Sequence, residues 1–312
     1  MRAPEFWGRD GVVPRLLSPL AALYAGVTAW RVARPGWEAP MPVLCIGNAG
    51  VGGSGKTTVA LDLAARLIAR GRRVAFLTRG YGGRLAGPLR VDALRHGAAE
   101  VGDEALLLAA AAPTYLGADR GRAAQMALAQ GAEVLVLDDG LQNPSLRKTR
   151  SLLVIDGAAG FGNGRVIPAG PLREPVAAAA RRCAAAVLIG TDATGALARL
   201  PEGLPVLRAH LVSVPPPAGP LVAFAGIGRP EKFRETLVAA SGQVRALHEF
   251  ADHHPYTEAE LRPILAAAAG ATVVTTPKDM VRVPAALRSR ITPVGVRLAW
   301  DTPPDPILDF LP

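Results

Sequence analysis

Lysine and cysteine are both scarce in this sequence of 312 residues. Only four of the 35 basic residues are lysines, so the net charge of +9 comes almost entirely from arginine. An arginine-rich surface favours anionic partners such as phosphates, acidic lipids or nucleic acid, although a base-composition bias explains most individual arginines equally well. Two cysteines, Cys45 and Cys183, provide neither a disulfide framework nor a metal-ligand spacing, and a reducing cytosolic setting fits them best.

A hydrophobic run long enough to cross a membrane is missing from the first forty residues. The uncharged segment 16–30 would span about 22 Å as a helix, short of the roughly 30 Å hydrocarbon core of a bilayer. No signal-peptide cleavage site follows it. Apolar residues at three- and four-residue spacing, flanked by arginines, predict an amphipathic helix that either lies in the plane of a membrane or docks on the protein. These residues, the apolar stripe, are Leu16, Leu20, Leu23, Val27 and Trp30.

Beyond residue 42 the sequence alternates between strand-like and helix-like segments. Short apolar runs that end in Gly or Asp read as strands buried on both faces, and the helices between them predict an α/β fold with a mostly parallel sheet flanked by helices. The first helix is expected over about residues 56–70. The proline-rich segment 214–220 is the best linker, and the same rhythm restarts after it. Two α/β units, the second smaller, are therefore predicted.

Residues 50–57, GVGGSGKT, match the phosphate-binding pattern GxxxxGK[ST]. The glycines let backbone N–H groups close on the β-phosphate, and the following helix contributes its positive end. Lys56 reaches the β- and γ-phosphates, while the Thr57 hydroxyl can ligate Mg²⁺. Because the pattern stands between a strand and a helix, it predicts an ATP site and a sheet of P-loop NTPase type. The predicted nucleotide-binding residues are Gly50, Val51, Gly52, Gly53, Ser54, Gly55, Lys56, Thr57 and Thr58.

A P-loop site also needs an acidic residue at the end of a neighbouring strand. The segment EVLVLDDGLQ, residues 133–142, supplies Asp138 and Asp139 in that position. One carboxylate can hold Mg²⁺ directly or through water, and the other can orient groups of the loop. An ordinary Asp-Gly turn is the weaker reading. The predicted metal ligands are Thr57, Asp138 and Asp139.

The residues that face the phosphate acceptor are harder to identify. Phosphoryl transfer needs charge neutralisation and a carboxylate near the acceptor hydroxyl. In VGDEALL, Asp103 stands at a helix start, where a simple N-cap explains it better from the pattern alone. The loops TRGYGG and PAGPLREP hold Arg79 with Tyr81 and Arg173 with Glu174, which suit either anion contact or surface turns.

The segment ADHHPYT, residues 251–257, clusters one aspartate and two histidines. Such a set suggests metal binding, but no fourth ligand stands nearby at a useful spacing. A histidine pair is more often structural or solvated. The segment TTPKD, residues 275–279, is only loosely similar to the guanine-selecting NKxD motif, and its order is wrong.

Taken together, these segments resemble one family, the tetraacyldisaccharide 4′-kinases of lipid A biosynthesis. The P-loop is generic, whereas RGYGG, DDGLQ and GNGxxxPAGPLRE in one chain are highly specific. The resemblance implies two α/β/α units with the active site in the cleft between them, at the cytoplasmic face of the bacterial inner membrane. It runs in order through GNAGVGGSGKT, TRGYGG, VGDEALL, ADR (residues 118–120), LDDGLQ, VIDG, FGNGRVIPAGPLRE, AGIGRPEKF, ADHH and PKDMV.

The resemblance also implies roles for the matching residues. Asp103 would activate the acceptor 4′-hydroxyl, and His253 would support it across the cleft, although the adjacent His254 leaves the choice of histidine open. Asn143 and Pro144 depart from the family pattern and receive no role. The implied catalytic residues are Asp103, His253, Asp138, Asp139, Arg173 and Glu174. The implied substrate-binding residues are Arg79, Tyr81 and Arg120.

We therefore predict a monomeric, Mg²⁺- and ATP-dependent lipid kinase that phosphorylates the 4′-hydroxyl of tetraacyldisaccharide 1-phosphate. Its predicted parts are a membrane-associating helical segment over residues 1–40, a P-loop kinase domain over 41–218 and a smaller α/β domain over 219–312 that closes the cleft. The N-terminal helix would bind the inner-membrane surface. No nucleic-acid partner is predicted, because the basic residues are dispersed without interleaved aromatic side chains.

The strongest alternative is a P-loop ATPase that acts as a nucleotide-dependent membrane switch. Such proteins usually carry an additional lysine early in the loop, where this sequence has Val51. A GTP-dependent metallochaperone would require a His- or Cys-rich delivery segment and a true NKxD motif, and the sequence has neither.

Overall fold

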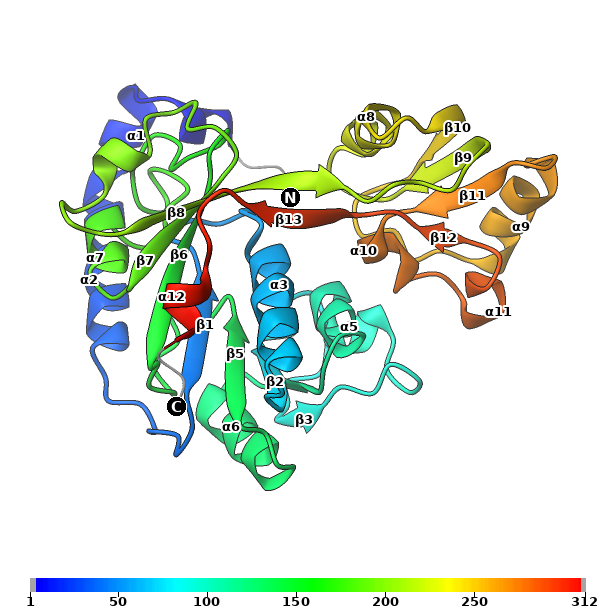
Figure 1. The fold of residues 1–312 in the computed structure, drawn as a ribbon. Helices are drawn as coiled ribbons and strands as arrows, with labels where there is room; N and C mark the ends of the chain where they lie inside the picture. The colour runs from blue at the N-terminus through cyan, green and yellow to red at the C-terminus, as the bar shows by residue number, and fades with distance from the viewer. Residues whose placement is uncertain (1–3, 310–312) are drawn as a thin grey trace.

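The alternating strands and helices form two sheets in the structure, a computed structural model that describes residues 4–309 (Figure 1). The larger sheet has nine strands in the order β13-β8-β7-β6-β1-β5-β2-β4-β3, and its inner strands run parallel. Only the edge pairs β13–β8 and β3–β4 are antiparallel. Its strands are β1 (Val43–Gly47), β2 (Val74–Thr78), β3 (Leu89–Arg90), β4 (Thr114–Leu116), β5 (Val134–Asp138), β6 (Arg150–Asp156), β7 (Ala185–Ile189), β8 (Val206–Ser213) and β13 (Val296–Trp300).

Both faces of the larger sheet are buried, as the uninterrupted apolar runs predict. Along β1, Val43 and Cys45 belong to one core, whereas Leu44 and Ile46 belong to the core on the opposite face. The second of these cores includes α3 (Lys56–Ala69), which ends one residue before the predicted end. The first includes residues of α2 (Ser18–Val32), α6 (Arg120–Ala129) and α7 (Val176–Ala180). The mixed α/β fold class is thus as predicted.

Short helices occupy several of the connections between strands. Around the site these include α4 and α5, which follow one another between β3 and β4. The further helices of the larger part are η1 (Glu5–Gly8), α1 (Val12–Leu16), α4 (Ala98–Val101), α5 (Asp103–Ala109), η2 (Leu197–Arg199) and α12 (Asp305–Leu308).

The smaller sheet has four parallel strands in the order β10-β9-β11-β12. Phe224 and Val222 contribute to the core on one face, and Leu221 and Ala223 to the core on the other. Its strands are β9 (Pro220–Ala225), β10 (Gln243–Glu249), β11 (Thr272–Thr275) and β12 (Thr292–Pro293), and its helices are α8 (Pro230–Ala239), α9 (Glu258–Ala267), α10 (Pro277–Met280) and α11 (Ala285–Arg288).

The two sheets are joined by a ribbon made of β8 and β13. In Figure 1, β8 runs from the larger sheet toward the smaller one and β13 runs back beside it, and the Val214 N–H donates to the Gly295 carbonyl beyond the paired region (2.9 Å). The chain therefore returns to the larger sheet after β12. The predicted domain boundary at residue 219 stays a prediction. It places the segment 296–300 in the smaller domain, whereas in the structure this segment forms β13, which pairs with β8 in the larger sheet.

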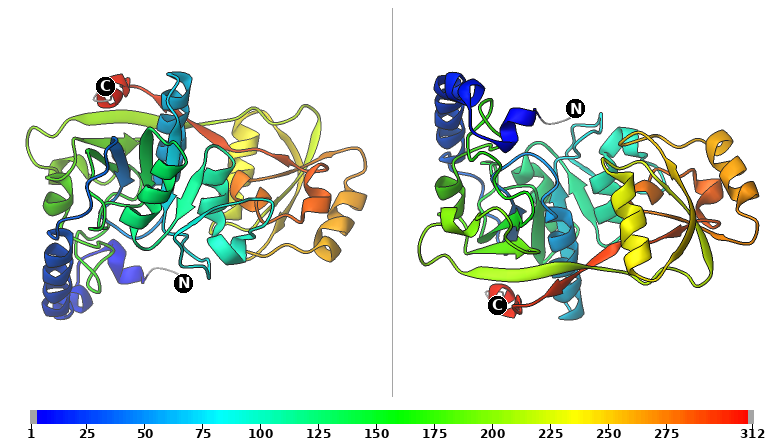
Figure 2. Two further views of the ribbon diagram at one scale, coloured as in Figure 1. Left: turned by 90° about the horizontal axis from the view of Figure 1, so that it is seen from below. Right: turned by 90° about the horizontal axis from the view of Figure 1, so that it is seen from above.

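The N-terminal helix α2 docks on the larger unit through small side chains. The apolar stripe, of which Leu16 lies at the end of α1 and the other four residues lie on α2, is left in solvent. Ala21 and Thr28 are buried against the larger unit, whereas Leu20, Leu23 and Trp30 are 57%, 67% and 63% exposed. Figures 1 and 2 place α1 and α2 at the end of the molecule far from the smaller sheet. Over residues 4–309, no helix combines the length and apolar character needed to cross a membrane.

Asp279 organises the smaller unit from a fully buried position. Its Oδ1 accepts hydrogen bonds from the Gly226 N–H (3.0 Å), the Tyr256 hydroxyl (2.8 Å) and Arg282 Nη2 (2.7 Å). Its Oδ2 accepts one from the Thr276 hydroxyl (2.6 Å). Burial and this carboxylate raise the pKa of the Tyr256 hydroxyl, which therefore stays protonated and donates. The ends of β9 and β11 are thereby tied to α10.

We expect Asp279→Ala to lower the free energy of unfolding of the smaller unit by about 3–5 kcal/mol, because it leaves the Arg282 guanidinium buried and partly unpaired. Native-state hydrogen exchange of amides in β9 and β11 measures this change. Glu231→Ala on α8 is the matched control, because it removes an exposed carboxylate paired only with Arg234 and should cost within about 0.5 kcal/mol. Equal protection in the two variants would contradict the assignment.

Candidate active site

The phosphate-binding loop lies between β1 and α3, as the sequence predicts. Lys56 is buried, and its Nζ lies 3.4 Å from the Gly52 carbonyl oxygen and 3.7 Å from Asp139 Oδ1. Gly55 has a φ of 81°, and a Cβ there would lie 2.6 Å from the Ile189 Cδ1 atom, so the loop needs glycine at this point. The loop thus holds the lysine at the start of the helix beside an acidic strand end.

Asp138, at the end of β5, lies beside the first turn of α3. The Thr57 hydroxyl donates to Asp138 Oδ2 (2.9 Å), while Asp138 Oδ1 is buried with no hydrogen-bond partner among the described residues. The Ser54 hydroxyl of the loop is buried and unpartnered in the same way. Burial, with a contribution from Glu104, raises the pKa of Asp138 to about 7. Unpaired oxygens next to a hydroxyl form a donor set suited to a hard cation such as Mg²⁺.

Asp139 is held by two cations. Arg173 Nη1 lies 2.9 Å from both of its carboxylate oxygens, and Lys56 Nζ makes the longer contact of 3.7 Å with Oδ1. Burial alone would raise the pKa of Asp139, but Lys56 and Arg173 outweigh it and hold the pKa below its ordinary value. The Arg173 N–H also donates to the Ala49 carbonyl (2.7 Å), which joins the PAGPLRE loop to the phosphate-binding loop. The structure therefore brings together five of the predicted donor-side residues, Lys56, Thr57, Asp138, Asp139 and Arg173.

Glu174 points away from these groups into a buried network. It is 3% exposed, and Arg182 donates to both of its oxygens (2.7 and 2.8 Å). Gln142 Nε2 donates to Glu174 Oε1 and to the Asn48 carbonyl, each at 2.8 Å. Through Gln142, Glu174 thus links the PAGPLRE loop to the DDGLQ loop and to Asn48, two residues before the phosphate-binding loop. The sequence reasoning assigned no role to Gln142 or Arg182, although Gln142 stands within the quoted DDGLQ segment.

The acceptor-side carboxylate, Asp103, begins α5 and is contacted by the smaller unit. His253 Nδ1 lies 2.7 Å from Asp103 Oδ2, and Arg282 Nε lies 3.4 Å from the same oxygen. Asp103 is 6% exposed, whereas the His253 side chain is about half exposed. The neighbouring His254 turns away and pairs with Glu260 Oε1 (2.9 Å). Of the two histidines, His253 is therefore the one beside Asp103.

Arg282 was missed by the sequence reasoning. It is buried in the smaller unit, where its Nη2 donates to the Gly226 carbonyl (3.0 Å) and to Asp279 Oδ1, and its Nη1 donates to the His254 carbonyl (3.1 Å). These contacts fix the guanidinium so that its Nε faces Asp103. Its only signal in the sequence is its place directly after the quoted segment PKDMV.

The TRGYGG loop supports α5 through its backbone. Gly102, which precedes Asp103, has a φ of 85°, and a Cβ there would lie 2.3 Å from the Tyr81 carbonyl oxygen. A Cβ on Gly83 would lie 2.6 Å from the Glu100 carbonyl oxygen. The two loops therefore pack backbone against backbone, which only glycine permits. The side chain of Tyr81 remains 76% exposed, and that of Arg79 is exposed too.

Arg120 differs from the other predicted substrate-binding residues because it is buried. Its Nη1 donates to the Gly117 carbonyl, while its Nε has no partner among the described groups. Burial lowers the pKa of Arg120 to about 10. The predicted contact with substrate stays a prediction, and burial at the start of α6 favours an indirect role.

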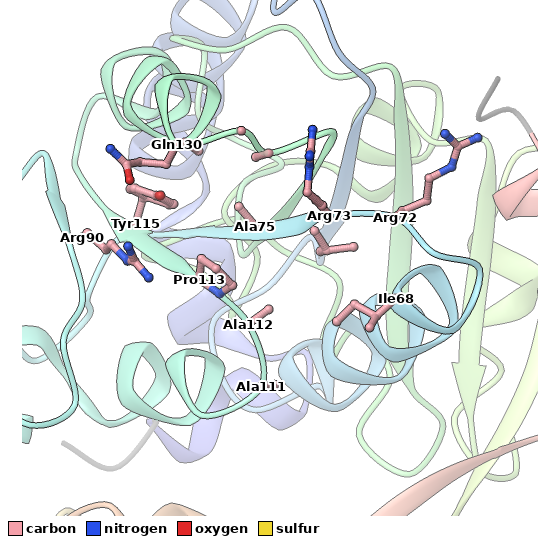
Figure 3. A pocket seen from close by; sticks show the side chains of 14 residues that line it. Ile68, Arg72, Arg73, Ala75, Arg90, Ala111, Ala112, Pro113, Tyr115 and Gln130 are labelled. Carbon is pink, nitrogen blue, oxygen red and sulfur yellow. The ribbon is translucent and has the colours of Figure 1, made fainter.

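Two cavities lie outside this site. One, of about 330 Å³, is at the amino ends of β2 and β4 (Figure 3). The phosphate-binding loop lies at the opposite, carboxyl ends of the parallel strands. Arg72, Arg73, Arg90, Tyr115 and Gln130 are among the residues that line it. The other, of about 540 Å³, lies beside the end of α2. None of the predicted site residues lines either cavity.

The family model for tetraacyldisaccharide-1-P 4′-kinase matches residues 13–309. The chain belongs to this family. Tetraacyldisaccharide 4′-kinases from Gluconacetobacter diazotrophicus and Rhodospirillum rubrum are 59% and 50% identical to it, over 99% and 97% of this chain and 98% and 95% of their own. The prediction of a tetraacyldisaccharide 4′-kinase, made from the motifs, is thereby confirmed.

A solved structure of the family supports the fold. The crystal structure of the "apo" form of LpxK from Aquifex aeolicus in complex with ATP aligns with a TM-score of 0.77 at 25% identity, over 96% of this chain and 98% of the other. The predicted fold class of the kinase, a large mostly parallel sheet flanked by helices, is confirmed by this match.

The raised pKa of Asp138 predicts a pH-dependent stability in the absence of nucleotide and Mg²⁺. The folded state holds this proton more tightly than the unfolded state, so the contribution to stability is complete below about pH 4 and is lost as the pH rises through about 7. We expect the stability of Asp138→Asn to rise by on the order of 4 kcal/mol relative to that of the unmutated protein between those two pH values. Urea unfolding at each pH measures the difference, and a constant difference would contradict the assignment.

Proposed function

We propose that the chain transfers the γ-phosphate of ATP to the 4′-hydroxyl of tetraacyldisaccharide 1-phosphate through a site made by both units. The observation that carries this proposal is Asp103, a buried carboxylate of the larger unit contacted by His253 and Arg282 of the smaller one. The neighbouring Glu104 is near enough to Asp138 to raise the pKa of that carboxyl. The candidate base therefore stands close to the candidate donor site.

On the donor side, Lys56 and the loop N–H groups would bind the β- and γ-phosphates. The ATP complex of the Aquifex relative supports ATP as the donor. Thr57 and Asp138 would hold Mg²⁺, which when bound neutralises charge on the phosphates. The unpaired Asp138 Oδ1 is the observation that fits a metal here. Asp139, fixed between Lys56 and Arg173, would keep both cations directed at the phosphates.

On the acceptor side, Asp103 would take the proton of the 4′-hydroxyl. His253 and Arg282 both contact Oδ2, so Oδ1 is the oxygen that would face the hydroxyl. Their N–H groups would hold the carboxylate in position for this proton transfer. Arg79 and Tyr81, exposed on the neighbouring loop, would contact the anionic sugar, whereas Glu174 and Arg120 would act by positioning the loops.

The apolar stripe of α2 would attach the protein to the cytoplasmic face of the inner membrane as a monomer. Its side chains are exposed although they are large and apolar, and arginines flank them. An in-plane helix of this kind buries its apolar face at the headgroup boundary. The alternative of a membrane switch is supported by no observation beyond the P-loop itself.

We expect the purified protein to form a bis-phosphorylated lipid from Mg-ATP and tetraacyldisaccharide 1-phosphate. Asp103→Ala should lower kcat by about 10²–10⁴-fold, because it removes the base, and should leave the affinity for ATP unchanged. Radiolabelled phosphate transfer and equilibrium binding of nucleotide measure the two effects.

The matched control for this substitution is Glu235→Ala, which removes an exposed carboxylate from α8. Its kcat should equal that of the unmutated protein. Normal turnover in Asp103→Ala would refute the base assignment. ATP hydrolysis without a phosphorylated lipid would instead favour the membrane switch.

We expect the double substitution Leu20→Gln with Leu23→Gln to weaken binding to phospholipid vesicles by at least about tenfold, because it removes apolar area that a membrane would bury. Vesicle flotation measures the bound fraction. Val238→Gln is the control, since Val238 is equally exposed but lies on α8. Unchanged flotation of the double variant would mean that the stripe is not the attachment surface.

A further inference from the structure

The larger of the two cavities lies between the C-terminal end of α2 and the loop that precedes β6. Its volume of about 540 Å³ falls in the range of small-molecule sites. It is separate from the phosphate-binding loop and from Asp103. Its polar lining comprises Arg34, Glu38, Arg147, Lys148, Ser151 and Arg182.

The charges of this lining do not balance. Four side chains are basic and one is acidic. Arg147 pairs with Glu38 (2.7 Å), and Arg182 is paired with Glu174 of the buried network. Among the contacts of residues 4–309, neither Lys148 nor Arg34 has a carboxylate partner.

Lys148 is a half-buried cation with a neutral partner. Its Nζ donates to the Asn143 carbonyl oxygen. Burial lowers the pKa of the Lys148 ammonium, and the nearby Arg182 acts in the same direction. An ammonium group removed from water without a counter-ion costs free energy. An anion in the cavity would supply the missing charge.

Arg34 connects the cavity to the apolar stripe. Its guanidinium carbon lies 3.8 Å from the ring centroid of Trp30, the last residue of the stripe. Trp30 itself is well exposed. A ligand with a charged head and an apolar tail could therefore place the head beside Lys148 and the tail along α2.

We propose that this cavity binds the phosphate headgroup of an acidic membrane phospholipid, with Lys148, Arg34 and Ser151 as the contacts to the phosphate. The membrane attachment through α2 is the part of the proposed function on which this rests. A free phosphate ion has the same oxygens, but it has no apolar tail that could contact the stripe next to the cavity. The lipid source is therefore favoured over the free ion.

Isothermal titration with dihexanoyl phosphatidylglycerol, kept monomeric below its micelle concentration, tests the proposal. A non-hydrolysable ATP analogue with Mg²⁺ blocks the phosphate-binding loop during the titration. We expect saturable binding that Arg34→Gln and Lys148→Met each weaken by about tenfold or more, as for loss of a charge-assisted hydrogen bond. Lys148→Arg, which keeps the charge, should restore most of the affinity.

Arg31→Gln is the matched control, because it removes an exposed arginine of α2, three residues before Arg34 and outside the cavity. Its affinity should stay within about twofold of the unmutated protein. An equal loss of affinity in Arg31→Gln would mean that the general positive charge of the surface, and not this cavity, binds the lipid, and would overturn the proposed site. Equally tight binding of inorganic phosphate or of dihexanoyl phosphatidylcholine would overturn the acidic-lipid assignment, and so would a lack of binding.

Kinase assays of the same variants separate this proposal from the proposed function. With acceptor dispersed in detergent, Arg34→Gln should keep its kcat, because Arg34 is not part of the catalytic site. Loss of lipid binding with intact kinase activity supports the cavity, whereas an inactive unmutated protein that still binds the lipid would contradict only the proposed function. Thermal unfolding checks that Lys148→Met is folded, and Arg34→Gln tests the site from an exposed position.

Discussion

Burying a carboxylate costs free energy unless cations or hydrogen-bond donors compensate its charge. Most contacts of the candidate active site provide such compensation. Asp139 lies between two cations, and Glu174 is paired with an arginine and an amide. Asp103 is compensated from the other unit by His253 and Arg282. Asp138 is the exception, because a single threonine hydroxyl is its side-chain partner and one oxygen is unpaired. This uncompensated carboxylate is the one that we propose as a ligand of Mg²⁺.

The compensation also explains which loops must meet. Arg173 reaches Asp139 because the PAGPLRE loop hydrogen-bonds to the backbone of the phosphate-binding loop. Asp103 reaches its position because Gly102 lets α5 begin against the TRGYGG backbone. Each specific motif of the sequence therefore either carries a charge of the site or removes a Cβ that would separate two loops. The motifs therefore lie next to one another in the structure although they are far apart in the sequence.

The donor half of the site could be predicted from local patterns, and the acceptor half could not. A glycine loop between strand and helix is enough to place Lys56, and a strand end is enough to place Asp138. Nothing local joins Asp103 to His253, which is 150 residues away, so the pair came only from the family resemblance. Arg282 had no motif of its own. The burial of Glu174 and the pairing of β13 with the larger sheet depend on tertiary packing, which the periodicity of apolar residues in the sequence does not reveal.

The acceptor half is also the part of the site that depends on contacts between the two units. The chain crosses between the units twice, once after β8 and once before β13, and both crossings belong to one two-stranded ribbon. Across the cleft, Asp103 is contacted by a half-exposed histidine at 2.7 Å and by an arginine at the longer distance of 3.4 Å. Val281 of the smaller unit also packs against the apolar cluster that includes Val101 and Leu106 of the larger unit. The position of Asp103 beside His253 and Arg282 therefore depends on apolar packing between the units as well as on the polar contacts themselves.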